Sequence, residues 1–271
     1  MSSWPELEWV APESLDEALR LRAERDDATV LAGGTFLGIL MNQGLVTPTA
    51  FLALQRVPGL DRIEVDERGL RLGALVTHRA VELSPLVRER WPALAGTFGL
   101  VASPRVRNQA TVGGVLADAD YASDPPAMLT ALAARVVVQS VRGEREIPVE
   151  ELIVGHYETT LEPDELIVAV VVPNGQVRAT YRKFRTRSHE DRPCVGVAAV
   201  RRPSVLRVVV GAVAHRPQLF PDLCDPDASP EEVGRAYADA IDPIGDIRGS
   251  AGYRKRVIAV EVRRALEELA A

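Results

Sequence analysis

Two adjacent glycines, Gly33 and Gly34, constrain the fold of this chain more than any other feature. They divide the apolar stretch TVLAGGTFLGILMNQG, residues 29–44, into two short runs. The first run is typical of a buried strand and the second of a short helix, so the glycines predict a tight strand-to-helix turn. Free backbone N–H groups at such a turn can bind phosphate oxygens, and Thr35 adds a hydroxyl. Taken alone, an ordinary turn is the simpler interpretation.

A second glycine pair strengthens the phosphate interpretation. In NQATVGGVLADADYASD, residues 108–124, we expect an extended run to lead into Thr111, Gly113 and Gly114. Two such turns can close on one diphosphate from two sides, and the nearby Asp124 suits a ribose hydroxyl. The spacing matches neither the G-x-G-x-x-G fingerprint nor a P-loop. A dinucleotide bound here therefore implies a fold other than the Rossmann fold.

Periodicity along the rest of the chain predicts an α+β protein with three regions. Ser14 and Glu17 form the pattern of a capping box at the start of a helix over 15–24. The last helix, from about Ser250, carries one apolar stripe. Further helices are expected over 36–44 and, with breaks at the prolines, over 81–103, followed by one from about 128. Strands are expected at 28–32, 48–57, 135–141, 145–149, 164–173, 179–187, 194–202 and 206–214, with a hairpin over 63–76.

Composition excludes several functions. With 38 acidic and 32 basic residues the net charge is −6, which disfavours nucleic-acid binding. Cys194 and Cys224 are the only cysteines, too few for an iron–sulfur cluster, which needs about four. The four histidines lie far apart in the sequence, so no metal site is predicted. No signal peptide or apolar run long enough for a bilayer is found, and we expect a cytoplasmic protein.

The basic stretch RATYRKFRTRSHEDR, residues 178–192, has two interpretations. It is either an edge strand protected by charge or a segment in which Lys183 serves a cofactor while the arginines face another subunit.

Several motifs together resemble one family. LAGGTFLGIL, VASPRVRNQATVGGVLADADYASDPP, LEPDELIVAVVVP, YRKFRTR and DIRGSAGYRKRVIAVEVRRAL occur in the order seen in the FAD-binding (medium) subunit of molybdenum hydroxylases. That group contains carbon monoxide dehydrogenase and xanthine dehydrogenase. The resemblance covers nearly the whole chain. It implies a two-subdomain FAD-binding fold of the vanillyl-alcohol-oxidase/PCMH type, over 1–57 and 58–175. A C-terminal α/β domain with a three-stranded antiparallel sheet, over 176–271, would follow.

The resemblance also implies which residues bind FAD. The diphosphate would lie between the two glycine turns, Asp124 would bind the ribose or ribityl region, and Lys183 would lie near the flavin. Ile167, with Leu166 beside it, would pack against the cofactor. The implied cofactor-binding residues are Leu31, Ala32, Gly33, Gly34, Thr35, Phe36, Leu37, Val101, Ser103, Thr111, Gly113, Gly114, Val115, Asp124, Leu166, Ile167 and Lys183.

Val115 departs from the family pattern, which usually has Asn after the second glycine pair. If that Asn makes one useful hydrogen bond, Val115→Asn should tighten FAD binding about three- to tenfold. If Val115 instead packs into a drier turn, the substitution should weaken both folding and binding.

The implied function is that of an electron-transfer subunit in a larger oxidoreductase. Electrons would pass from a molybdenum cofactor on a large subunit, through iron–sulfur clusters on a small subunit, to this FAD and then to an external acceptor. No catalytic acid, base or nucleophile is assigned, because the flavin carries the redox chemistry. Two alternatives remain: a stand-alone FAD-dependent oxidase or NAD(P)H reductase, and a scaffold subunit that has lost FAD.

Overall fold

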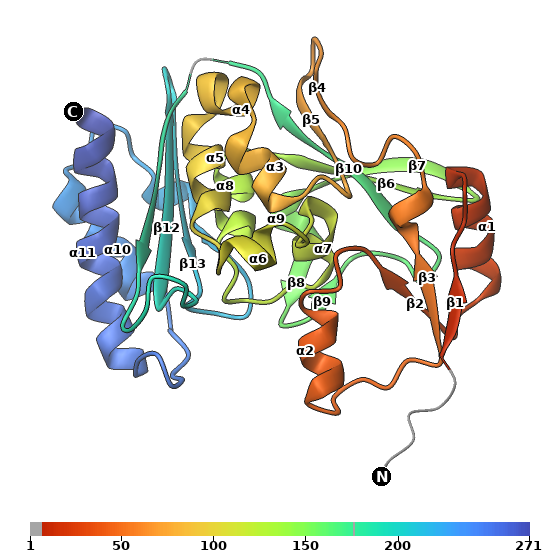
Figure 1. Cartoon of the computed structure of the whole chain (residues 1–271). Coiled ribbons are helices and arrows are strands. Elements are labelled where there is room, and N and C mark those ends of the chain that lie inside the picture. Colours follow the sequence, from red (N-terminus) through yellow and green to blue (C-terminus); the bar gives the residue numbers. More distant parts are fainter. Residues whose placement is uncertain (1–6, 176) are drawn as a thin grey trace.

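The computed structural model describes residues 7–175 and 177–271. Figure 1 shows three main sheets side by side, which follow one another along the chain. Helices lie between the second and third sheets, and two long helices cover the outer face of the third. The predicted α+β class is confirmed at this level.

The first sheet is parallel, with the strand order β1-β3-β2. Ser14 caps α1, since its hydroxyl accepts a hydrogen bond from the N–H of Glu17. The other half of the predicted capping box differs, because the Glu17 carboxylate accepts from the N–H of Glu13 rather than from that of Ser14. The elements of this region are β1 (Glu8–Val10), α1 (Leu15–Glu24), β2 (Ala28–Leu31), α2 (Leu37–Asn42), β3 (Ala50–Ala53) and the 3-10 turn η1 (Leu54–Arg56).

The second sheet is antiparallel and has the order β4-β5-β10-β6-β7. Its long central strand β10 is buried except at its end, as expected for a continuous apolar run. The strands are β4 (Ile63–Val65), β5 (Gly69–Gly73), β6 (Arg135–Ser140), β7 (Gly143–Pro148) and β10 (Leu166–Pro173), with β8 (Ile153–Gly155) and β9 (Glu158–Thr159) as a separate pair.

Short helices pack beside this sheet, and prolines begin several of them. Pro85 and Pro92 occupy first-turn positions of α4 and α5, so the predicted breaks are confirmed. The extended run expected before Thr111 is wrong, because α6 stands there. Pro104 starts this helix, and Arg107 anchors it through the Glu82 carboxylate. The helices are α3 (His78–Leu83), α4 (Pro85–Arg90), α5 (Pro92–Gly99), α6 (Pro104–Arg107), α7 (Val112–Ala117), α8 (Pro125–Ala131) and α9 (Val149–Leu152).

The third sheet is antiparallel, with the order β11-β12-β13-β14. Its three long strands were predicted, but a fourth, two-residue strand pairs with β13 and makes the sheet four-stranded. That pairing satisfies backbone groups that β13 would otherwise leave open at its edge. The elements are β11 (Arg178–Phe184), β12 (Val195–Arg202), β13 (Val205–Gly211), β14 (Gln218–Leu219), η2 (Pro221–Leu223), α10 (Pro230–Ala240) and α11 (Ala251–Ala270).

Helix α11 packs on the third sheet through the predicted apolar stripe, which is buried throughout. Two arginines of the edge strand β11 make contacts within the chain. Arg182 forms ion pairs with Glu261 and Glu268 of α11, and Arg178 donates to the carbonyl of Leu269. Whether the arginines of β11 also face a partner subunit, as one of the two interpretations expects, stays a prediction, since Arg178 remains exposed.

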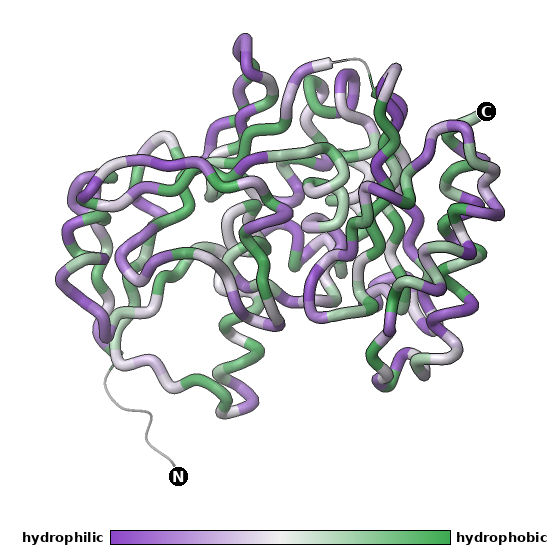
Figure 2. Tube along the Cα trace, turned by 180° about the vertical axis from the view of Figure 1, so that it is seen from behind, coloured by the Kyte–Doolittle hydropathy of each residue, from purple (hydrophilic) through white to green (hydrophobic). Residues whose placement is uncertain are grey.

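Hydropathy follows the same layers. Figure 2 shows hydrophobic segments along the inner strands and hydrophilic ones at hairpin tips and outer helix faces. Helix α2 is an exception, because it projects from the body and buries none of its residues. In the described part of the chain, no helix combines the length and apolar character needed to cross a bilayer.

Candidate functional site

A cleft of about 950 Å³ lies where the first and second sheets meet and where residues of the third region close over them. All the predicted site residues line it except Ser103. Ser103 instead precedes α6, so its expected place in the cleft is wrong. The two glycine turns, β10 and Lys183 of β11 are thus brought together from distant parts of the sequence.

The two glycine turns touch at Gly33. A Cβ atom at this position would lie 1.9 Å from the carbonyl oxygen of Gln109, so only glycine allows the approach. The left-handed backbone conformation occurs one residue later, at Gly34, where φ is +68°. Gly33 is therefore required for close approach and Gly34 for the change of chain direction.

The first turn offers hydrogen-bond donors to the cleft. In the described part of the chain no side chain caps α2, and the residue before the helix, Phe36, is already in helical conformation. Gln55 holds the neighbouring carbonyl of Ala32 from outside the turn. Among the described residues, none accepts a hydrogen bond from the N–H groups of Gly33, Gly34, Thr35, Phe36 and Leu37. A run of free N–H groups is suited to the oxygens of a phosphate chain.

The second turn does not offer donors in the same way. At the start of α7 the N–H of Val112 bonds to Val76, the N–H of Gly113 bonds to Ala74, and that of Gly114 bonds to the Thr111 hydroxyl. The glycines of this turn therefore supply no free N–H group, whereas the Thr111 hydroxyl still has its own O–H to donate, and a cradle that binds from both sides stays a prediction. The second turn lines the cleft and supports the first one, but its glycine N–H groups are already used.

Asp124 and Lys183, which also line the cleft, form a buried ion pair. The Lys183 ammonium donates to Asp124 Oδ2 at 2.8 Å and to the carbonyl of Leu100. The other oxygen, Oδ1, accepts from the Tyr181 hydroxyl at 2.8 Å. Burial raises the pKa of Asp124 despite the attraction of Lys183. Both oxygens thus have donors within the chain, and a ribose hydroxyl would have to compete with them.

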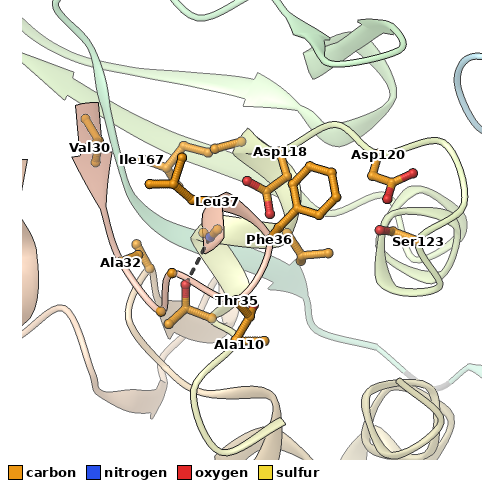
Figure 3. Close-up of a pocket in the computed structure, with 18 of the residues that line it drawn as sticks. Val30, Ala32, Thr35, Phe36, Leu37, Ala110, Asp118, Asp120, Ser123 and Ile167 are labelled. Atoms are coloured by element: carbon orange, nitrogen blue, oxygen red, sulfur yellow. Dashed lines mark hydrogen bonds between the residues drawn. The ribbon is translucent and has the colours of Figure 1, made fainter. Parts of the chain in front are cut away.

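Two further acidic residues, Asp118 and Asp120, follow the last residue of α7 and were not among the predicted site residues. Asp120 is buried and forms an ion pair with Arg192, whose guanidinium lies over the Phe36 ring at 5.5 Å from its centre. Asp118 has no side-chain hydrogen bond or ion pair among the described residues, and Figure 3 shows its carboxylate directed into the cleft. In the sequence, the one feature that indicates these two residues is that they follow closely after the second glycine pair.

His78 lies behind the second turn and also lines the cleft. Its Nε2 contacts the Thr111 carbonyl at 3.2 Å, so this nitrogen carries the proton and donates it. Burial lowers the pKa of His78 to about 4, which keeps the ring neutral. The side chain positions the turn as a neutral donor. Among the described residues, no group of three or more His, Cys, Asp or Glu side chains is arranged to hold a metal ion.

The fold and the cleft, which is lined by free N–H groups and a buried lysine, define a class of protein that binds a large, phosphate-containing cofactor. The chain belongs to the family described as the FAD binding domain in molybdopterin dehydrogenase, which matches residues 5–175. The residues present fit FAD, since the first turn supplies donors and the cleft has room for a large cofactor.

Individual relatives of known name are similar to this chain over nearly its whole length. Two are from Paenarthrobacter nicotinovorans. The 6-hydroxypseudooxynicotine dehydrogenase complex subunit alpha is 36% identical over 97% of this chain and 94% of its own length. The nicotine 6-hydroxylase medium subunit is 36% identical over 98% of each chain. The solved carbon monoxide dehydrogenase from Hydrogenophaga pseudoflava contains a chain that superposes with a TM-score of 0.91, at 30% identity and 98% coverage of each chain.

Proposed function

We propose that the chain is the FAD-binding electron-transfer subunit of a molybdenum-containing hydroxylase or dehydrogenase complex. Its role is to pass electrons from the iron–sulfur clusters of a small partner subunit to an external acceptor, while a large subunit carries the molybdenum cofactor. The observation that carries this proposal is the cleft, which is lined both by the free N–H groups of the first turn and by the buried Lys183. FAD bound there supplies the redox chemistry.

The residues of the chain bind and orient the cofactor. The N–H groups from Gly33 to Leu37 hold the diphosphate, and Lys183 lies toward the flavin end with Asp124 as its counter-ion. Ile167 supplies an apolar wall beside Leu37, which excludes water. The other predicted residues that line the cleft complete its walls.

The three sheets support a division into three parts that follows the predicted boundaries. Residues 1–57 and 58–175 form the two FAD-binding subdomains of the vanillyl-alcohol-oxidase/PCMH type, and 176–271 form the C-terminal domain. The first two sheets fall wholly within the first two ranges, and the four-stranded sheet with α10 and α11 falls in the third. Lys183 gives the C-terminal domain a direct part in the cleft.

The test is to purify the full chain and measure its flavin. We expect one FAD per chain, released completely on denaturation, because neither glycine turn contains a His or Cys as an attachment point. Colourless protein that takes up no added FAD would contradict the proposal and favour a scaffold subunit. Flavin that stays with the denatured protein would indicate a covalent link.

A second measurement separates the subunit from a stand-alone enzyme. The purified flavoprotein should not be reduced by NAD(P)H or by the substrate of its complex unless the other two subunits are added. Rapid reduction of the isolated chain by a small donor would contradict the proposed role.

A further inference from the structure

We propose that Asp118 binds the cofactor directly, by accepting a hydrogen bond from a sugar hydroxyl next to the diphosphate. The inference rests on the proposed FAD function and deepens it. It assigns the sugar-binding carboxylate to Asp118 rather than to Asp124 alone.

The position of Asp118 supports this assignment. It follows Ala117 directly at the end of α7, and the backbone N–H of Asp118 bonds to the carbonyl of Gly114. This fixes the residue to a helix that is itself anchored against β5. Figure 3 shows its carboxylate directed into the cleft on the side of Phe36 and Leu37. The side chain is thus held in place by the backbone while its oxygens remain open.

Among the residues that the structure describes, the neighbouring acids Asp120 and Asp124 have partners for their carboxylates and Asp118 does not. Asp120 pairs with Arg192 and accepts from the N–H of Ala122, and Asp124 is held by Lys183 and Tyr181. Within the described residues, the Asp118 carboxylate has no such donor. A half-buried carboxylate without a donor is unfavourable, and a hydroxyl from a bound ligand would satisfy it.

The negative charge of Asp118 and its position beside the first turn indicate which chemical group of the ligand it binds. A phosphate would be repelled by the ionised carboxylate, whereas a hydroxyl is a donor that matches it. The free N–H groups of Phe36 and Leu37, where the diphosphate is proposed to lie, belong to the neighbouring turn. In FAD the groups bonded next to the diphosphate are the ribityl chain on one side and the adenosine ribose on the other, and both carry hydroxyls.

The experiment titrates the flavin-free full chain with FAD, comparing wild type with Asp118→Asn and Asp118→Ala. Asp61→Asn, on an exposed residue, controls for the loss of one negative charge. We expect Asp118→Ala to weaken FAD binding about tenfold or more and Asp118→Asn somewhat less, since an amide oxygen still accepts. The control should bind as wild type does.

Thermal unfolding without FAD separates binding from folding. An unpaired carboxylate near Asp120 stabilises nothing, so Asp118→Asn should be at least as stable as wild type in the absence of FAD. Weaker binding by a protein of undiminished stability therefore supports the proposal. Equal or tighter FAD binding by both variants would overturn it while leaving the FAD function intact. A wild type that binds no FAD would overturn both.

Two fragments of FAD identify the hydroxyl. Titration with FMN reports the ribityl side and titration with ADP the ribose side. A loss of affinity in Asp118→Asn for FMN only assigns the ribityl chain, and a loss for ADP only assigns the ribose. Losses for both fragments place the carboxylate within reach of hydroxyls on either side, which also supports the proposal.

Dependence on pH gives an independent readout. Burial and the charge of Asp120 raise the pKa of Asp118 to about 7, and Arg192 opposes them; Tyr157 is the other titratable group nearby. Only the ionised form accepts fully, so wild-type affinity should rise about tenfold from pH 6 to pH 8. Asp118→Asn should show no such rise. A fall with rising pH in wild type would mean that protonated Asp118 donates to a phosphate, and would overturn the proposal.

Discussion

At the scale of single residues, the close contact between the two glycine turns leaves no space for a side chain at Gly33. Gly33→Ala places a Cβ atom against the backbone of Gln109, which cannot rotate away. We expect the free energy of unfolding to fall by about 1–3 kcal/mol and FAD affinity to fall at least tenfold. Chemical denaturation and FAD titration measure the two effects.

Gly38 provides the matched control in the neighbouring helix. A Cβ atom there meets nothing within 4 Å, and alanine favours a helix by up to about 1 kcal/mol over glycine. Gly38→Ala should therefore keep full FAD affinity. If both variants behave alike, close approach at Gly33 is not what shapes the cleft.

Val115 is the second single residue for which the structure changes an expectation about FAD binding. It is partly buried, packs against the core of the second region and lines the cleft. This packing favours the second of the two outcomes considered for Val115→Asn. We expect the variant to lose about 1–3 kcal/mol of stability and to bind FAD more weakly, because the amide enters an apolar site.

Val115→Ala, which removes only the packing, is the comparison for that variant. Tighter FAD binding by Val115→Asn at unchanged stability would contradict this view. It would show instead that an amide at this position gains a hydrogen bond.

At the scale of elements, the loop before α11 is held by Asp246. Its carboxylate pairs with Arg254 at 2.7 Å and with Arg248, and accepts from the Tyr121 hydroxyl. Arg254 is fully buried, so α11 begins with a charge that Asp246 must balance. Asp246→Asn should lower the free energy of unfolding at pH 7 by about 2–3 kcal/mol.

The pH dependence of this effect has a definite sign. Although burial opposes it, the hydrogen bonds from Tyr121, Arg248 and Arg254 lower the pKa of Asp246 to about 2. Because the pKa of Asp246 is lower in the folded protein than in the unfolded chain, its ionised carboxylate stabilises the fold above about pH 4. This stabilisation is lost as the pH falls through about 2. The gap between wild type and Asp246→Asn, followed by denaturation at several pH values, should therefore close in acid. A gap that stays constant would contradict the ionic explanation.

At the scale of the whole molecule, the Lys183–Asp124 pair joins the third sheet to the start of α8. Both side chains are almost completely buried. Lys183→Met would leave Asp124 buried without its counter-ion, so stability should fall by about 3–5 kcal/mol. The double variant Lys183→Met/Asp124→Asn should recover most of this loss, because no unpaired charge remains.

FAD binding distinguishes packing from function at this pair. If Lys183 contacts the cofactor as proposed, the double variant should regain stability in urea denaturation but not FAD affinity. Recovery of both would show that the pair only joins the sheets.

The sequence by itself determined the family and most of the longer elements, but not α6 or β14. Apolar periodicity located the strands and α11, Ser14 located the start of α1, and the prolines located the breaks among α3, α4 and α5. The glycine motifs located both turns of the cleft. These features depend on residues close together in the chain, where backbone preference and side-chain pattern act locally.

Tertiary structure decided what each site residue can do. The N–H groups of the second turn are used by Ala74 and Val76, and the oxygens of Asp124 are used by Tyr181 and Lys183. Asp118 remains open because no donor from residues 7–175 or 177–271 reaches its carboxylate. Hydrogen-bonding capacity is limited, and partners distant in the sequence compete for it, so folding alone settles which donors and acceptors remain for a cofactor.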